Sequence, residues 1–210
     1  MVIKMRIFLL FAICLMFINA TCNKTKDCFN QSYSFNAYSK IYPDIDSISI
    51  GDTLWIALNE ATSFIDNKTD KTIDYSKASN LGFGITFDKF IGGNFNNPGT
   101  VSAVNKFTTV LKEGIEISSL QPDRIKSFNF IELSNRYKFK VAIIPNQSGI
   151  YSVAISDVSN VYRGNDKCTK AKFNISFKNT NQHLNLYQDN RPGYEISEYE
   201  KNHMYCFKVY

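Results

Sequence analysis

Alternating apolar and polar positions run through most of the chain after residue 40. In the clearest stretch, Tyr137–Ile144, Lys138 and Lys140 alternate with aromatic and aliphatic residues. A period of two places one face of a strand in a core and the other face in water. Comparable runs predict strands at 47–50, 54–58, 72–75, 84–91, 128–133 and 149–155.

Glycine, asparagine and proline separate these runs. Gly51-Asp52 lies between two β-rich stretches and predicts a tight turn joining two paired strands. The segment 92–99 predicts a loop, and 145–149 predicts a turn. Val101–Leu111 fits a helical face or a strand, and its threonines favour the strand.

Many short strands with few helical patterns predict an all-β fold, an immunoglobulin-like β-sandwich. The segment 148–151, Ser-Gly-Ile-Tyr, resembles the tyrosine corner of immunoglobulin-like domains, and Val153 stands where antibody domains have a cysteine. Trp55 is the candidate for a buried core indole. We expect one sandwich domain over residues 41–210, in which residues from about 165 to 210 form a C-terminal β-hairpin extension.

The N-terminus predicts an export signal. A basic segment, Met1–Arg6, precedes an apolar run, Ile7–Ile18, of 12 residues, whereas a membrane-spanning helix needs about 20. Cleavage after Ala20 would release a soluble product. Cleavage before Cys22, with residues 1–21 as the signal peptide, would leave that thiol available for acylation.

The second cleavage is favoured because Ile18–Cys22 resembles the lipobox of bacterial lipoproteins, in which small residues precede the modified cysteine. Residues 22–40, rich in Asn, Lys, Ser and Thr, would then form a lipidated tether. Two or more acyl chains hold a protein firmly on a membrane. Surface-exported lipoproteins usually carry an acidic cluster after the cysteine, whereas Lys24 and Lys26 follow it here. The periplasmic face of an outer membrane is therefore favoured over the cell surface.

Three further segments extend this resemblance. Together with the signal, Tyr42–Trp55, Pro145–Tyr151 and Tyr205–Val209 resemble small lipoproteins of the Bacteroidota. The resemblance implies a β-sandwich held on a lipid anchor in the cell envelope. Its motifs are structural, so it carries over no catalytic, metal-binding or cofactor-binding residues.

Two triplets, Asp46-Ser47-Ile48 and Asp52-Thr53-Leu54, resemble the Asp-Ser/Thr-aliphatic sequences that are O-glycosylated in exported proteins of that phylum. Both triplets also suit the start of a strand. Glycosylation and a purely structural role therefore both stay open.

The charge pattern argues against nucleic-acid binding. The formal net charge is +5 and falls to +3 when Lys4 and Arg6 leave with the signal. The other lysines and arginines are scattered rather than striped, whereas nucleic-acid binding requires a basic patch. Export argues against this class independently.

The cysteines predict one disulfide. Cys14 leaves with the signal and Cys22 would be acylated, so Cys28, Cys168 and Cys206 remain. In an oxidising compartment three cysteines allow three pairings and leave one thiol over. We favour Cys168–Cys206, because both lie in alternating segments that suit neighbouring strands; the alternative is that all three are ordinary core residues.

Candidate catalytic groups are scarce. His183 and His203 are the only histidines, and no Gly-x-Ser-x-Gly elbow is present. We expect both histidines to be structural, the protein not to be an enzyme, and no cofactor. Paired Cys-x-x-Cys spacing is absent, so no zinc site is expected. Asp44 and Asp46 could offer oxygens to calcium, but a turn leading into a strand explains them better.

Aromatic residues are the remaining sign of binding, with 17 Phe, 12 Tyr and one Trp. Aromatic side chains stack on sugars and anchor partners, although most should fill a core. The sequence thus predicts a lipid-anchored envelope protein that acts as a non-catalytic binding or interaction module, with a protein or glycan partner. The alternatives are a glycan-binding accessory lipoprotein and, less favoured, a hydrolase. The candidates for an exposed aromatic cluster are Tyr187, Tyr194, Tyr199, Tyr205 and Tyr210.

Overall fold

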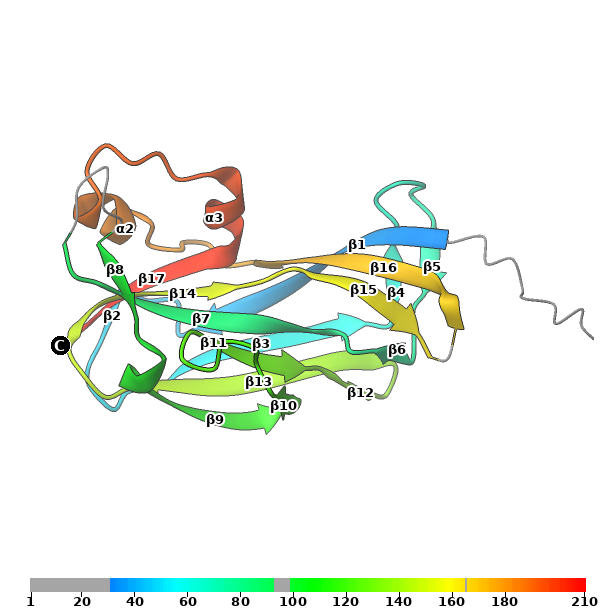
Figure 1. Cartoon of the computed structure of the whole chain (residues 1–210), viewed down its shortest axis with the longest axis horizontal. Coiled ribbons are helices and arrows are strands. Elements are labelled where there is room, and N and C mark those ends of the chain that lie inside the picture. The colour runs from blue at the N-terminus through cyan, green and yellow to red at the C-terminus, as the bar shows by residue number, and fades with distance from the viewer. Residues whose placement is uncertain (1–30, 93–98, 165) are drawn as a thin grey trace, which may run out of the picture. The chain divides into compact units, whose positions relative to one another are not determined.

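Two β-sheets make up most of the part of the chain that the computed structural model describes, residues 31–92, 99–164 and 166–210 (Figure 1). The larger sheet has eight strands in the order β12-β13-β3-β1-β16-β15-β6, with β9 paired to β13. Its strands are β1 Gln31–Tyr42, β3 Leu54–Ala61, β6 Ala78–Ser79, β9 Phe107–Glu113, β12 Ile131–Leu133, β13 Arg136–Pro145, β15 Val158–Arg163 and β16 Asp166–Phe177.

The smaller sheet has seven strands in the order β10-β11-β7-β14-β17-β2, with β8 paired to β7. Its strands are β2 Ser47–Ile48, β7 Gly82–Phe90, β8 Thr100–Ser102, β10 Ile115–Ile117, β11 Ile125–Asn129, β14 Gly149–Ile155 and β17 Met204–Val209. A separate hairpin joins β4 Ser63–Ile65 to β5 Thr72–Asp74, and the helical elements within the described ranges are η1 Val104–Lys106, α2 Asn185–Asn190 and α3 Glu198–His203.

The core lies between the two sheets and is rich in aromatic rings. Phe139 of β13 meets Phe83 of β7 with ring centroids 4.8 Å apart, and Phe107 of β9 meets Tyr151 of β14 at 5.0 Å. Ring pairs at these distances contribute beyond their buried area. Because the packed rings come from opposite sheets, the predicted β-sandwich is confirmed.

The predicted tyrosine corner is also present. The hydroxyl of Tyr151 donates to the backbone oxygen of Gln147 at 2.9 Å, while its ring is fully buried. Gly149 precedes it with φ +153°, and a Cβ there would press on the Lys89 side chain. The corner therefore turns the chain from β13 in one sheet to β14 in the other.

Two expectations for the N-terminal third differ from the structure. The Gly51-Asp52 turn is present, but the strands beside it do not pair with each other: β2 pairs with β17, and β3 pairs with β1 and β13. In addition, β1 begins at Gln31, inside the predicted tether. Buried and exposed residues already alternate before residue 40, so the described part of the predicted tether belongs to a strand of the β-sandwich.

The C-terminal segment is not a β-hairpin, which corrects the prediction for 165–210. β16 belongs to the larger sheet, β17 belongs to the smaller one, and α2 and α3 lie between them in sequence. The two helices lie beside β17 at one end of the sandwich (Figure 1). One face of β17 fills the core, while Met204 and Cys206 pack against Tyr187 under the helices. This explains why β17 reads as a nearly continuous apolar run.

Candidate functional site

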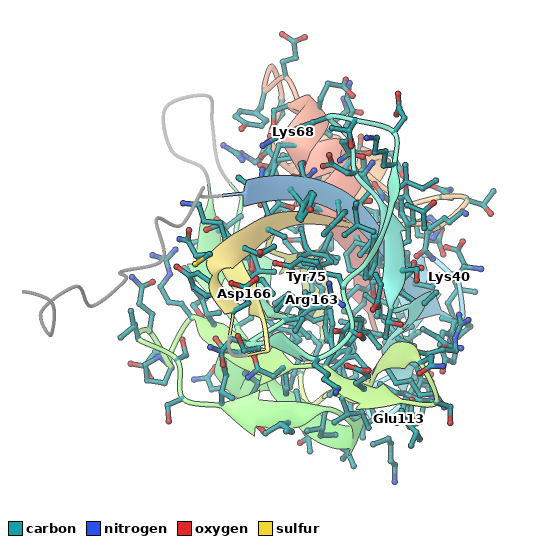
Figure 2. The ribbon with its side chains drawn as sticks, turned by 90° about the vertical axis from the view of Figure 1, so that its right-hand side faces the viewer. Lys40, Lys68, Tyr75, Glu113, Arg163 and Asp166 are labelled. Carbon is teal, nitrogen blue, oxygen red and sulfur yellow. The ribbon has the colours of Figure 1, made fainter. Side chains whose placement is uncertain are left out.

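The outer face of the larger sheet carries exposed aromatic and basic side chains on β1. Side chains on this strand alternate, so Tyr38, Lys40 and Tyr42 point outward while the residues between them are buried. Tyr38 is 40% exposed and Tyr42 is 37% exposed. Lys40 lies at the outside of the molecule in Figure 2. Exposed aromatic rings gathered on one sheet face make this surface a candidate binding site.

The first part of this face joins three neighbouring strands. Tyr42 of β1 is the register partner of Trp55 of β3, and their rings stack with centroids 6.5 Å apart and an interplanar angle of 21°. Lys140 of β13 places its Nζ 4.6 Å from the centroid of Trp55 and 5.7 Å from that of Tyr42. Because an ammonium group is attracted to the faces of aromatic rings, the three side chains hold one another in place.

The second part lies further along β1. Lys178, immediately after β16, places its Nζ 5.2 Å from the ring centroid of Tyr38. The backbone N–H of Tyr38 donates to Glu60 Oε1 at 3.0 Å, and the backbone N–H of Lys178 donates to the carbonyl oxygen of Ser39 at 2.8 Å. These bonds fix the backbone from which Tyr38 and Lys178 project.

Ala57 forms the floor of a groove between the two parts. Its register partners are Lys40 on β1 and Lys140 on β13, and its methyl group leaves space that a longer side chain would fill. The groove has a volume of about 600 Å³. We call the surface around it the aromatic–lysine face, made of Tyr38, Lys40, Tyr42, Trp55, Lys140 and Lys178.

The groove brings aromatic rings together with amine, amide and carboxylate groups. The residues that line the groove are tyrosine, lysine, alanine, leucine, asparagine and glutamate. Aromatic rings offer flat apolar surfaces, and lysines offer positive charge and hydrogen-bond donors. A ligand with flat ring faces and polar edges would match both.

The two sequence predictions about aromatic residues are wrong here. Trp55 is partly exposed on the outer face rather than buried in the core. The tail tyrosines do not form one exposed cluster, because Tyr187 and Tyr205 are buried whereas Tyr199 and Tyr210 are exposed. The Tyr-x-Lys-x-Tyr alternation of residues 38–42 could have indicated an exposed aromatic face on a strand. These residues span the end of the predicted tether, residues 22–40, where no strand was expected.

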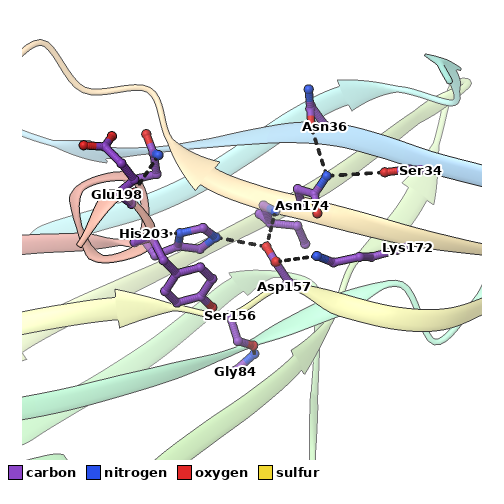
Figure 3. Close-up of polar contacts among 12 residues, drawn as sticks. Ser34, Asn36, Gly84, Ser156, Asp157, Lys172, Asn174, Glu198 and His203 are labelled. Carbon is purple, nitrogen blue, oxygen red and sulfur yellow. Dashed lines mark hydrogen bonds and ion pairs between the residues drawn. The ribbon is translucent and has the colours of Figure 1, made fainter. Parts of the chain in front are cut away.

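His203, at the end of α3, is paired with a carboxylate (Figure 3). Its Nε2 lies 2.9 Å from Asp157 Oδ1, and its Nδ1 lies 2.7 Å from the carbonyl oxygen of Tyr199. The Tyr199 ring stacks on the imidazole at 3.8 Å. Asp157 also accepts from the N–H of Ile175 at 2.9 Å and pairs with Lys172 at 3.2 Å. The pair therefore links α3 to β16.

A cavity of about 190 Å³ borders His203 and also contacts Asp88 and Ser152. Burial raises the pKa of the Asp88 carboxyl. Both ring nitrogens of His203 lie within hydrogen-bond distance of acceptors in the chain, Asp157 Oδ1 and the Tyr199 carbonyl oxygen. Because these contacts attach the imidazole to Asp157 and to its own helix, they favour a structural role for His203.

His183, in the loop before α2, also meets an aspartate. Its Nε2 lies 3.5 Å from Asp44 Oδ1, and its ring meets Tyr205 edge-on at 5.3 Å. The Tyr205 hydroxyl lies 3.3 Å from the same carboxylate oxygen and donates to the backbone oxygen of Ile45 at 2.8 Å. No cluster of three metal-ligating side chains occurs among the described residues. Asp44 thus helps to fix β17 against the loop before β2.

The predicted Cys168–Cys206 disulfide is wrong. Cys206 is a free cysteine with no exposed surface, on β17 of the smaller sheet. Cys168 lies on β16 of the larger sheet. The prediction assumed that two alternating segments close in sequence order would be neighbouring strands, whereas the sandwich puts them in different sheets. Cys22 and Cys28 lie outside the described residues.

Anchoring and modification stay predictions. The described ranges contain no helix that is long and apolar enough to cross a membrane, and the predicted signal peptide lies outside these ranges. Ser47 and Thr53, the hydroxyl residues of the two candidate glycosylation triplets, are both partly exposed.

No protein-family model and no curated protein matches the sequence. Among solved structures the chain is similar to the type II cohesin dyad from the adaptor ScaA scaffoldin of Acetivibrio cellulolyticus, with a TM-score of 0.25 and 11% identity, covering 70% of this chain and 46% of that one. It is also similar to the CupB6 tip adhesin from Pseudomonas aeruginosa, with a TM-score of 0.21 and 12% identity, covering 71% of this chain and 42% of that one. The chain therefore spans less than half the length of either structure.

Proposed function

We propose that this protein is a non-catalytic binding module of the cell envelope that holds a glycan on its aromatic–lysine face. The lipid anchor at Cys22 that would place it at a membrane belongs to the same proposal. The supporting observation is the set of three partly exposed rings, Tyr38, Tyr42 and Trp55, on one sheet face around a groove.

The rings favour a glycan for a physical reason. Sugar rings present flat faces of C–H groups that pack on aromatic rings, while their hydroxyls stay available to polar groups. The Tyr42 and Trp55 rings are nearly parallel, with an interplanar angle of 21°, and Lys140 beside them restricts their movement. Ligand binding therefore costs little side-chain ordering. A protein partner is the main competing occupant, because Tyr and Trp are also enriched in protein interfaces.

The chain contains its own reporter for this test, because Trp55 is its only tryptophan and lies in the face. Soluble glycans should change the tryptophan emission in a saturable way. Tyr42→Ala should weaken binding by roughly 30-fold, as expected for losing an aromatic side chain that contributes about 2 kcal/mol.

The matched control is Tyr210→Ala. Tyr210 is also an exposed tyrosine with a lysine, Lys208, over its ring at 4.5 Å, but it lies at the C-terminus outside the face. The Tyr210→Ala variant should therefore bind glycans with the affinity of the wild type. The proposal fails if no glycan in a broad panel alters the emission, or if Tyr42→Ala binds as tightly as the Tyr210→Ala control.

A further inference from the structure

We infer that the glycan on this face is anionic, carrying carboxylate or sulfate groups. This inference rests on the proposed glycan-binding function and adds the charge of the ligand. It follows from the three lysines of the face and from what surrounds them.

The lysines form a row across the sheet. Lys140, Ala57 and Lys40 are register partners on β13, β3 and β1, so the two lysines emerge on one face with only a methyl group between them. Two strand spacings separate their backbones, about 10 Å. Lys178 continues the row on the far side of β1, where its N–H bonds to Ser39.

These charges have no carboxylate partner among the residues that the structure describes. The lysine ion pairs there belong to Lys126, Lys172 and Lys201. Lys140 and Lys178 instead lie over aromatic rings. The three lysines therefore leave a net positive charge on this face, which an anionic ligand would neutralise.

The acidic group nearest to the groove does not cancel this charge. Glu60 lines the groove, but its Oε1 accepts a hydrogen bond from the backbone N–H of Tyr38. Glu60 contributes one negative charge to the groove lining, whereas Lys40 and Lys178 contribute two positive charges and Lys140 lies beside them. The groove therefore has a positive excess that attracts anions and that salt weakens.

The rings select a sugar polymer over an acidic peptide. The lysine row runs between two aromatic sites, the Tyr42–Trp55 pair on one side and Tyr38 on the other. An acidic polysaccharide offers both elements at once, ring faces for the aromatics and anions for the row. An acidic peptide without aromatic residues would use only the lysines.

The test uses two matched pairs of polymers on the purified full chain. Polygalacturonate is compared with its neutral methyl ester, and dextran sulfate with dextran, by tryptophan emission at low salt and at about 0.3 M sodium chloride. At least one acidic polymer should bind at least about tenfold more tightly than its neutral partner at low salt, and this difference in affinity should be smaller at the higher salt concentration.

Variants assign the preference to the row. Lys40→Gln with Lys140→Gln should weaken binding of the acidic polymer about tenfold and remove most of its salt dependence. Lys208→Gln is the control, because Lys208 also lies over a tyrosine ring but outside the face. It should change neither the affinity for the acidic polymer nor the salt dependence of binding. Retained preference in the double variant overturns the inference.

Other outcomes separate the two proposals. Equal binding of acidic and neutral polymers, insensitive to salt, overturns the anionic inference and leaves the glycan proposal standing. Poly-glutamate binding as tightly as the acidic polysaccharides overturns it in favour of an acidic peptide. Binding of neutral polymers alone also overturns it, whereas failure of all four polysaccharides counts against both proposals.

Discussion

The side chains packed around Cys206 shield its thiol from solvent. It has no exposed surface and contacts the cluster that includes Met204 and Tyr187 under the helices. Burial in apolar surroundings raises the pKa of this thiol, so little thiolate forms at neutral pH.

We therefore expect Cys206 to resist alkylation in the native protein and to react fully once the protein is unfolded. Mass spectrometry of the tryptic peptide 202–208 after brief iodoacetamide treatment, with and without guanidinium chloride, measures both states. A non-reducing peptide map serves as the control. Recovery of this peptide joined to one containing Cys168 would contradict the structure.

The position of Trp55 shows what the sequence could not decide for one residue. Both alternating sets in 54–58 are apolar, since Leu54, Ile56 and Leu58 form one set and Trp55 and Ala57 the other. Either set could face a core. The three aliphatic residues are buried, because they meet the opposite sheet, and Asn59 marks the Trp55 side as the outer face. A tryptophan alone does not identify a core position.

At the scale of the elements, Asp157 connects the C-terminal helix to the sheet. Burial alone would raise the pKa of this carboxyl, but hydrogen bonds from His203, the Ile175 N–H and Lys172 lower it below its usual value. Because the folded state favours the carboxylate, Asp157 adds stability above its usual pKa of about 4. That contribution is lost as the pH falls through the lowered folded-state value.

Asp157→Asn should therefore lower the free energy of unfolding by about 1–3 kcal/mol at neutral pH and by less at about pH 3. Urea unfolding followed by circular dichroism at several pH values measures this. The wild type should lose stability in acid more steeply than the variant. Asp66, Asp74 and Glu200 also have a lowered pKa, because hydrogen bonds from neighbouring groups outweigh burial, so the variant should keep part of the slope. Parallel curves for the two proteins would rule this role out.

The close pairing of β7 with β11 requires a glycine at position 82. A Cβ on Gly82 would overlap the carbonyl oxygen of Phe128 on β11, which is backbone and cannot move without disturbing the ladder. Gly82→Ala should destabilise the protein by about 3 kcal/mol or more.

Gly84→Ala is the matched control on the same strand. Its Cβ would meet the side-chain Cγ2 of Ile125, which can rotate. Thermal unfolding of the two variants should show a clearly larger loss for Gly82→Ala. Equal losses would mean that the strain is not specific to the close approach of β7 and β11.

The strands themselves were largely readable from alternation, whereas their partners were not. The runs at 137–144 and 149–155 became β13 and β14, and the turn between them carries the predicted corner. Sheet membership depends on contacts between residues far apart in sequence, such as the parallel pairing of β2 with β17. Local pattern contains no information about these contacts, so the Gly51-Asp52 turn and the C-terminal segment were assigned wrong partners.

At the scale of the whole sandwich, the two outer faces differ. α2 and the segment that follows it cover part of the smaller sheet, where Tyr187 and Ile196 pack against Met204 and Cys206. The larger sheet keeps Tyr38 and Tyr42 exposed. The proposed glycan surface therefore lies on the larger sheet, where exposed rings coincide with lysines that have no ion-pair partner among the described residues, and not on the face that the helices occupy.

The last prediction concerns how the molecule is held in the envelope. If Cys22 is acylated, the wild type should sediment with membranes and enter the detergent phase in Triton X-114 partitioning, whereas Cys22→Ser should stay in the aqueous phase. Cys28→Ser is the matched control and should remain with the membrane. Because residue 22 is not part of the aromatic–lysine face, Cys22→Ser should bind the same glycans with the same affinity. Membrane retention of Cys22→Ser would refute the anchoring part of the proposed function and leave its glycan-binding part standing, so tethering and recognition can be tested separately.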